Sequence, residues 1–149
     1  MKKYLFLAAL FCMGSVCMTS CGDDDDEKLP KIDEDTEFVT SKPTLKKVEG
    51  KQLTLSYTES VGKVKISVVE DWFFENSICV KATVTETYPS ESMAKSVFED
   101  MKKEGEDEGY TRNGKSIIFD ASSSYAHMTY QNIEEMLEWR VKEWEHMQK

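Results

Sequence analysis

Several kinds of residue are scarce in this 149-residue chain, and each scarcity argues against a class of site. There are two histidines, His127 and His146, and they lack the spacing of zinc ligands. The seven glycines are scattered and form no phosphate-cradling loop. After residue 21 the chain has a single cysteine, Cys79, so no disulfide can form within its main body. We therefore expect no metal, no cofactor and a core held by packing alone.

Basic residues are also in the minority. The chain has 19 Lys and Arg against 28 Asp and Glu, a net charge of −9 at pH 7. A nucleic-acid surface needs a basic stripe to replace phosphate counterions, and the sequence has none. We therefore expect no nucleic-acid partner.

Nucleophilic catalysis finds little support in the sequence. Residues 122–124 are serines and precede His127, but no nucleophile-elbow motif surrounds them, so they are interpreted as a polar turn before a helix. Acidic residues are too common for spacing to single out a glycosidase pair. The sequence therefore favours a non-catalytic binding module, with a small hydrolase as an alternative.

The longest apolar run lies at the start of the chain. Two lysines precede about ten apolar residues, 4–13, as in a signal peptide. The run is too short for a transmembrane helix, which needs about 20 apolar residues. The small residues Thr19 and Ser20 then precede Cys21. We expect residues 1–20 to be a signal peptide and the protein to be exported without a membrane span.

The residues around Cys21 resemble a bacterial lipobox, although Met18 stands where leucine is usual. This resemblance implies lipidation of Cys21; an ordinary signal peptide that leaves a free thiol is the alternative. An acidic run follows at once: Asp23, Asp24, Asp25, Asp26 and Glu27. It resembles the export signal of Bacteroidota-type surface lipoproteins, which implies a lipid-anchored protein on the outer membrane, at the cell surface. The alternatives are a solvated spacer and a periplasm-facing assembly accessory.

The acidic run continues into a segment with few apolar residues. Residues 22–37 contain nine acids and two lysines, so the segment repels itself and should be extended. Consecutive acids also lack the fixed turn that gathers ligands around calcium. We therefore expect residues 21–37 to be a disordered tether and residues 38–149 to form one domain.

Apolar and polar residues alternate through the first half of this domain. Regular strands are predicted in 53–57, 64–68 and 78–84, with turns at 59–63 and 75–77 between them. Alternation of this kind indicates an antiparallel meander with one buried face. Residues 38–39 and 45–48 could add a short edge strand, although Pro43 argues against this prediction.

Beyond Pro89 the apolar period changes to that of a helix. Helices are predicted from the N-cap Ser90 to Gly105 and over 130–147, with a hairpin turning at Asn113-Gly114 between them. The order βββ-α-ββ-α predicts an α+β two-layer sandwich with both helices on one sheet face. The stretch VKATVTETYPSESMAKSVFEDMKKEG resembles small lipoproteins of gut Bacteroidota. That resemblance implies the same arrangement but no activity and no site residues.

Aromatic residues supply the candidates for ligand binding. Trp72, Phe73 and Phe74 are adjacent, so one ring should point away from the core, and Trp72 is the candidate for stacking on a sugar or anchoring an interface. The alternative is a twisted strand end packed under a helix. Trp139 falls about 120° from the apolar stripe of the last helix, whereas Arg140 lies near its middle. Either the stripe is narrow and Arg140 snorkels past it, or the helix covers a second surface. An exposed Trp139 would mark a contact with a partner. We expect the ligand to be a glycan or a partner envelope protein.

Overall fold

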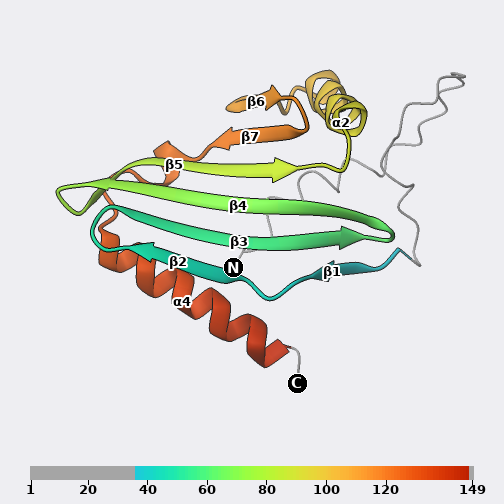
Figure 1. The fold of residues 1–149 in the computed structure, drawn as a ribbon. Coiled ribbons are helices and arrows are strands. Elements are labelled where there is room, and N and C mark those ends of the chain that lie inside the picture. The colour runs from blue at the N-terminus through green and yellow to red at the C-terminus, as the bar shows by residue number, and fades with distance from the viewer. Residues whose placement is uncertain (1–35, 148–149) are drawn as a thin grey trace, which may run out of the picture.

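The computed structural model describes residues 36–147 and confirms an α+β fold. The predicted signal peptide, Cys21, the acidic run and most of the tether lie outside the described residues. An antiparallel sheet of seven strands is accompanied by two long helices and one short one (Figure 1). The elements are β1 (Phe38–Thr40), β2 (Thr44–Val48), β3 (Gln52–Val61), β4 (Val64–Glu75), β5 (Ile78–Thr87), α2 (Glu91–Glu104), β6 (Tyr110–Asn113), β7 (Ser116–Asp120), α3 (Ser122–Tyr125) and α4 (Tyr130–Met147).

The sheet order is β1-β3-β4-β5-β7-β6, with β2 also paired to β3. Both long helices pack on the same face of this sheet, as predicted. One core cluster joins Trp72 and Phe74 of β4 to α4, and the other joins Ile66 and Val68 of β4 to α2. These residues alternate along one strand, so they share one face. The other face of the sheet carries neither α2 nor α4, and is called the open face below.

Two-residue turns set the register of three of the four hairpins in residues 36–147. β3 extends through the segment predicted to turn, because Val61 pairs with Val64 and leaves only Gly62 and Lys63 in the loop. Asn76 and Ser77 link β4 to β5, and both have positive φ, as a type I′ turn requires.

The predicted β6–β7 hairpin forms, but its turn is shifted by one residue. Asn113 pairs with Ser116, so Gly114 and Lys115 occupy the loop instead of Asn113 and Gly114. Within this loop only Gly114 has a positive φ, 56°. A positive φ at the first loop residue suits a type II′ turn, so glycine and not asparagine is the residue that the turn needs.

The edge next to β3 is divided into two strands around Pro43. β1 and β2 both pair with β3, and the chain between them leaves the ladder because proline has no N–H to donate. Ser41 stays attached: its N–H donates to the Thr58 carbonyl over 2.8 Å, and its hydroxyl accepts from the Thr58 N–H over 2.8 Å. The predicted edge strand is therefore real, but broken.

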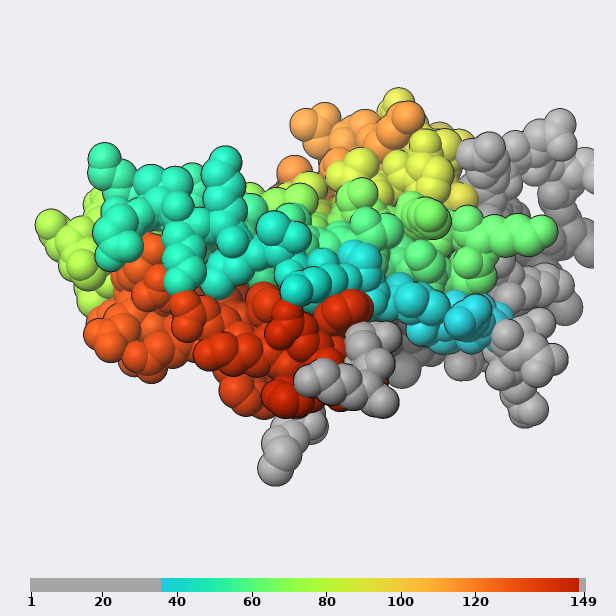
Figure 2. Space-filling view, turned by 60° about the horizontal axis from the view of Figure 1, so that its bottom comes forward, coloured from blue at the N-terminus to red at the C-terminus, as the bar shows by residue number. Residues whose placement is uncertain are grey.

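Helix α4 lies alongside this broken edge, as Figures 1 and 2 both show. The Trp144 Nε1 donates to the carbonyl of Thr40, the last residue of β1, over 3.0 Å. Lys47 of β2 forms ion pairs with Glu134, over 2.8 Å, and with Glu138. Helix α4 thereby supplies a hydrogen-bond donor and ion-pair partners to an edge that would otherwise be exposed.

The two ends of α2 follow the predicted capping residues. The Ser90 hydroxyl accepts from the Met93 N–H over 3.1 Å, and Gly105 ends α2 with a left-handed φ of 73°. The serine segment, predicted as a turn, forms the single helical turn α3 instead. None of the described helices is long and apolar enough to cross a membrane.

Candidate functional site

Three glutamates interrupt the apolar alternation on the helix-covered face. The residues two positions away from Glu59, Glu70 and Glu86 in the chain are apolar or aromatic and lie on the same face. Glu70 and Glu86 are each 5% exposed. Buried carboxyl groups are costly unless they are paired or protonated, so their surroundings decide their state.

Glu70 is paired with a cation from α4. Arg140 donates from Nη1 to Oε2 over 2.8 Å and from Nη2 to Oε1 over 2.7 Å, and the Tyr57 hydroxyl donates to Oε1 over 3.0 Å. Burial alone would lower the pKa of Arg140, but its bonds to Glu70 outweigh that effect and raise the pKa overall. This bidentate pair explains why an arginine lies in the middle of an apolar helix stripe.

The other two acids hold protons more tightly than ordinary carboxyl groups. Burial raises the pKa of Glu86 from 4.5 to about 7, and the hydrogen bond from the Tyr88 hydroxyl, 2.8 Å, only partly opposes this. Burial also raises the pKa of Glu59 to about 7, helped by the nearby charges of Glu86 and Glu70. Both groups therefore change charge near neutral pH.

A carboxyl pKa near 7 is one sign of a catalytic acid or base, but it also arises in structural networks. Glu70 is held by two partners and Glu86 is almost inaccessible, which favours a structural role. In residues 36–147 no three His, Cys, Asp or Glu side chains are placed to hold a metal ion. The ionisation of the acids on the covered face therefore affects the stability of the fold.

The side chains of Ser122 and Cys79 make contacts that hold the fold together. The Ser122 hydroxyl accepts from the Ala82 N–H over 3.1 Å and donates to the Ala82 carbonyl over 3.4 Å, so it joins α3 to β5. His127 is exposed and lies beyond the end of α3, at a φ of 75°. Cys79 is buried, which raises the pKa of its thiol, and its sulfur donates to the Lys81 carbonyl over 3.5 Å. These contacts support packing roles for both side chains.

The three adjacent aromatic residues divide between the two faces. The alternative interpretation, a strand end packed under a helix, holds for Trp72, and its role as an exposed platform does not. Trp72 is 1% exposed, because its pairing with Leu53 and Ala82 places it in the core under α4. Phe74 is also buried. Phe73 is the ring that points to the open face, where it is half-buried.

Trp139 lies on the outer side of α4, away from the buried residues Ile133 and Leu137 of the same helix. Its side chain is 42% exposed. Arg140, the next residue, turns inward to Glu70. Trp139 stays a candidate interface residue, and its binding role stays a prediction.

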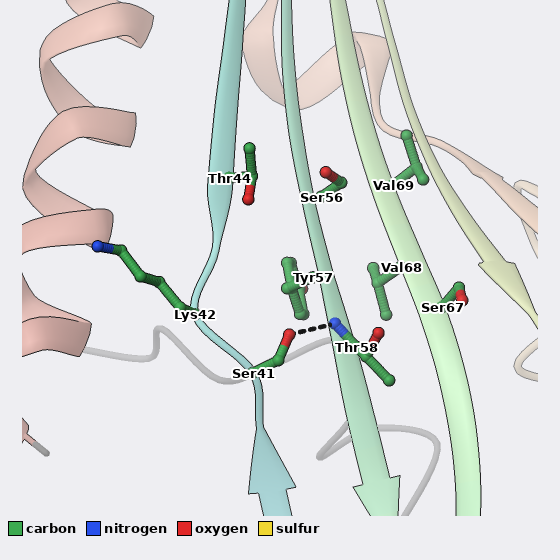
Figure 3. Close-up of a pocket in the computed structure, with 9 residues that line it drawn as sticks. All are labelled: Ser41, Lys42, Thr44, Ser56, Tyr57, Thr58, Ser67, Val68 and Val69. Carbon is green, nitrogen blue, oxygen red and sulfur yellow. Dashed lines mark hydrogen bonds between the residues drawn. The ribbon is translucent and has the colours of Figure 1, made fainter.

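The open face is rich in hydroxyl groups and is hollowed beside the break between β1 and β2. Figure 3 shows this shallow hollow, of about 360 Å³. Lys42, at its rim, extends toward α4 and pairs with Glu145. The hollow is lined by serine and threonine residues together with one tyrosine, two valines and Lys42. The serines and threonines are Ser41, Thr44, Ser56, Thr58 and Ser67, and the others are Tyr57, Val68 and Val69.

A second polar group lies on the same face, nearer the turn between β4 and β5. The Gln52 amide donates to Asp71 Oδ1 over 3.0 Å and to the Thr54 hydroxyl over 3.2 Å. Thr54 donates to the same Asp71 oxygen over 2.5 Å. Phe73 lies beside this trio, with the Lys81 ammonium 6.0 Å from its ring centroid. The open face therefore combines an aromatic ring with oriented polar groups.

Sequence reasoning missed the buried acids, although the strand alternation contains their signal. Glu59, Glu70 and Glu86 each stand at one of the alternate strand positions that are otherwise apolar. Arg140 stands in the apolar stripe of its helix. Only the structure shows that Glu70 pairs with Arg140 and that Phe73 lies on the open face.

The chain matches no protein-family model, no curated protein and no solved structure.

Proposed function

We propose that this protein is a lipid-anchored cell-envelope protein, exposed at the cell surface, which binds a ligand through the open face of its sheet. The observation that carries the binding role is that both long helices pack on one face and leave the other without them. That face presents hydroxyl groups, an oriented Asp71 trio and the Phe73 ring. Concave sites that combine aromatic side chains with a few placed polar groups are typical of ligand recognition.

The direction of the chain supports an anchored arrangement. Residues 36–37 precede β1 at the Gly62 end of the sheet, where the Gly62 N–H donates to the Glu37 carbonyl over 2.9 Å. Phe73 lies near the other end of β4, a strand of 12 residues that spans about 40 Å. A tether attached through Cys21 would therefore join the domain at the end of the sheet opposite to Phe73.

The anchor and the surface location are tested with the full chain in cells. Replacement of Cys21 by alanine should remove palmitate labelling and release the protein from membranes. Replacement of Asp23, Asp24, Asp25, Asp26 and Glu27 by alanine should keep the anchor but protect the domain from proteinase K on intact cells. If both the wild type and the five-alanine variant are cleaved equally, the acids act as a spacer; if neither is cleaved, the protein faces the periplasm.

The binding role is tested by cross-linking in living cells. A photo-reactive residue at Thr85, on the open face, should produce an adduct with the ligand. The same residue at Lys95, an exposed position on α2, is the matched control. Equal adducts at both positions, or none at Thr85, would contradict a binding role for the open face. Substrate turnover by the purified protein would favour the hydrolase alternative.

A further inference from the structure

We propose that the open face binds an uncharged oligosaccharide that lies along β3 and β4, from the Phe73 ring to the hydroxyl-lined hollow. This inference rests on the proposed binding function and names its ligand class. The ligand would contact three successive features: an aromatic ring, a rigid trio of polar side chains and a group of hydroxyls.

The aromatic ring lies at one end of the track. Phe73 pairs with Gln52 on one side and with Lys81 on the other, so polar side chains flank its ring. The apolar faces of sugar rings pack on aromatic side chains, while sugar hydroxyls need hydrogen-bond partners at the ring edge. Gln52 supplies an amide oxygen beside the ring. The Lys81 ammonium lies over the ring, 6.0 Å from its centroid, and would leave that face when a sugar stacks on it.

The polar trio lies next to the ring and is already oriented. Gln52 and Thr54 both donate to Asp71 Oδ1, and these bonds hold all three side chains in place without a ligand. They leave Asp71 Oδ2 and the Gln52 carbonyl oxygen as acceptors for ligand hydroxyls. Groups that need no reordering on binding lose little entropy, so such a trio favours affinity.

The hydroxyl group continues the same track along the strands. The register places four rows side by side on the open face: Gln52 with Phe73, Thr54 with Asp71, Ser56 with Val69, and Thr58 with Ser67. Six residues of β3 separate the first row from the last, a distance of about 20 Å. The hollow of about 360 Å³ opens at the last two rows. A track of this length suits several sugar rings in a line.

The charge on the open face selects an uncharged ligand over an ionic one. The strand positions that share this face hold three lysines and three acids, although the whole chain has a net charge of −9. They are Lys46, Lys65, Lys81, Asp71, Glu75 and Asp120. A surface with balanced charge gives no long-range attraction to a polyanion or a polycation.

The test measures binding of neutral oligosaccharides, from disaccharides to hexasaccharides of glucose, xylose, mannose and galactose, to the full-length protein in detergent. Affinity should rise with chain length until the track is filled. Phe73→Ala and Asp71→Asn should each weaken binding at least about tenfold. Thr111→Val, on the same face but on the far strand β6, is the matched control and should bind as the wild type does. If Phe73→Ala fails to fold, Phe73→Leu keeps the packing and removes the ring.

Three results would overturn the inference. They are the absence of binding by any neutral oligosaccharide, binding that neither Phe73→Ala nor Asp71→Asn weakens, and equal or tighter binding of uronic-acid oligosaccharides. If a cross-linker at Thr85 captures a protein while no neutral oligosaccharide binds, the oligosaccharide assignment fails and the binding function stands. If the cross-linker also captures nothing, both fail.

Discussion

Two neighbouring acids on opposite faces of the sheet have different surroundings. Glu70 and Asp71 are adjacent in β4, yet Glu70 lies at 5% exposure between the sheet and α4, while Asp71 lies on the open face. Glu70 is held by an arginine from a distant helix, and Asp71 by two polar side chains of the next strand. Under the helices a charge has to be neutralised; on the open face it can stay available for a ligand.

The largest effect should separate the two adjacent rings of β4. Trp72→Ala removes a fully buried side chain and should lower the free energy of unfolding by about 3–5 kcal/mol. Phe73→Ala, on the open face, should lower it by about 1 kcal/mol or less. Urea unfolding of both variants measures the difference. Equal losses would mean that the open face is packed as tightly as the core.

The pair between Glu70 and Arg140 should rank next. Arg140→Met leaves Glu70 buried without its cation and should cost about 3 kcal/mol, the lower end for a broken buried pair, because the Arg140 side chain is 30% exposed. The double variant Arg140→Met with Glu70→Gln should recover much of that loss, since no buried charge remains.

Arg112 offers a matched control for Arg140. Arg112 pairs with Glu91 over 3.3 Å, and the Glu91 side chain is 66% exposed. Arg112→Met should therefore change the unfolding midpoint little. A double variant at Glu70 and Arg140 that is no more stable than Arg140→Met alone would show that the lost stability came from packing instead of charge.

The stability of the protein should depend on pH through two acids of the covered face. Glu59 and Glu86 have pKa values raised from 4.5 to about 7, so the folded state prefers their protonated forms. The stability they contribute is fully present below about pH 4.5 and is lost as the pH rises through about 7. We expect a loss of about 1–3 kcal/mol between pH 5 and pH 8, measured by unfolding at fixed ionic strength.

Glu86→Gln tests which residue causes this slope. The substitution removes the titrating group and keeps a side chain that can accept from Tyr88. The decline in stability toward pH 8 should become shallower. An unchanged slope would assign the pH dependence to Glu59 or to groups outside the pair.

The smallest predicted effect compares Val84 with Thr85 on β5. Val84 is 7% exposed on the covered face, and Val84→Thr would bury a hydroxyl at a cost of about 1–2 kcal/mol. Thr85 is its neighbour on the open face, and Thr85→Val should change stability by less than about 0.5 kcal/mol. Thermal unfolding of the two variants checks the sign and size; a larger effect at Thr85 would reverse the comparison of the faces.

The elements with strong local signals were predictable. Ser90 and Gly105 bound α2 because a hydroxyl cap and a left-handed glycine act within one turn of the helix. The extra length of β3 was not, since Glu59 and Ser60 are weak strand formers that pairing with β4 keeps extended. Local propensity was overruled there by the hydrogen bonds of a central strand.

The candidate sites were predictable only in part. The three adjacent aromatic residues indicated that one ring would leave the core, but the choice between Trp72 and Phe73 depends on register. Pairing of Leu53 with Trp72 settles it, because directly paired residues share a face. A shift by one residue would have exposed the tryptophan instead.

The fold class, the two long helices and the alternation that separates a buried face from a polar one follow from local patterns, because they depend on neighbours within a few residues. The lipid anchor and its sorting signal stay predictions from the sequence. Only the tertiary structure decided which partners meet: Glu70 and Arg140 lie 70 positions apart, and no local pattern links them. The strand order of the sheet was not predictable either, because it depends on pairings between strands that are not consecutive in the chain, such as β5 with β7.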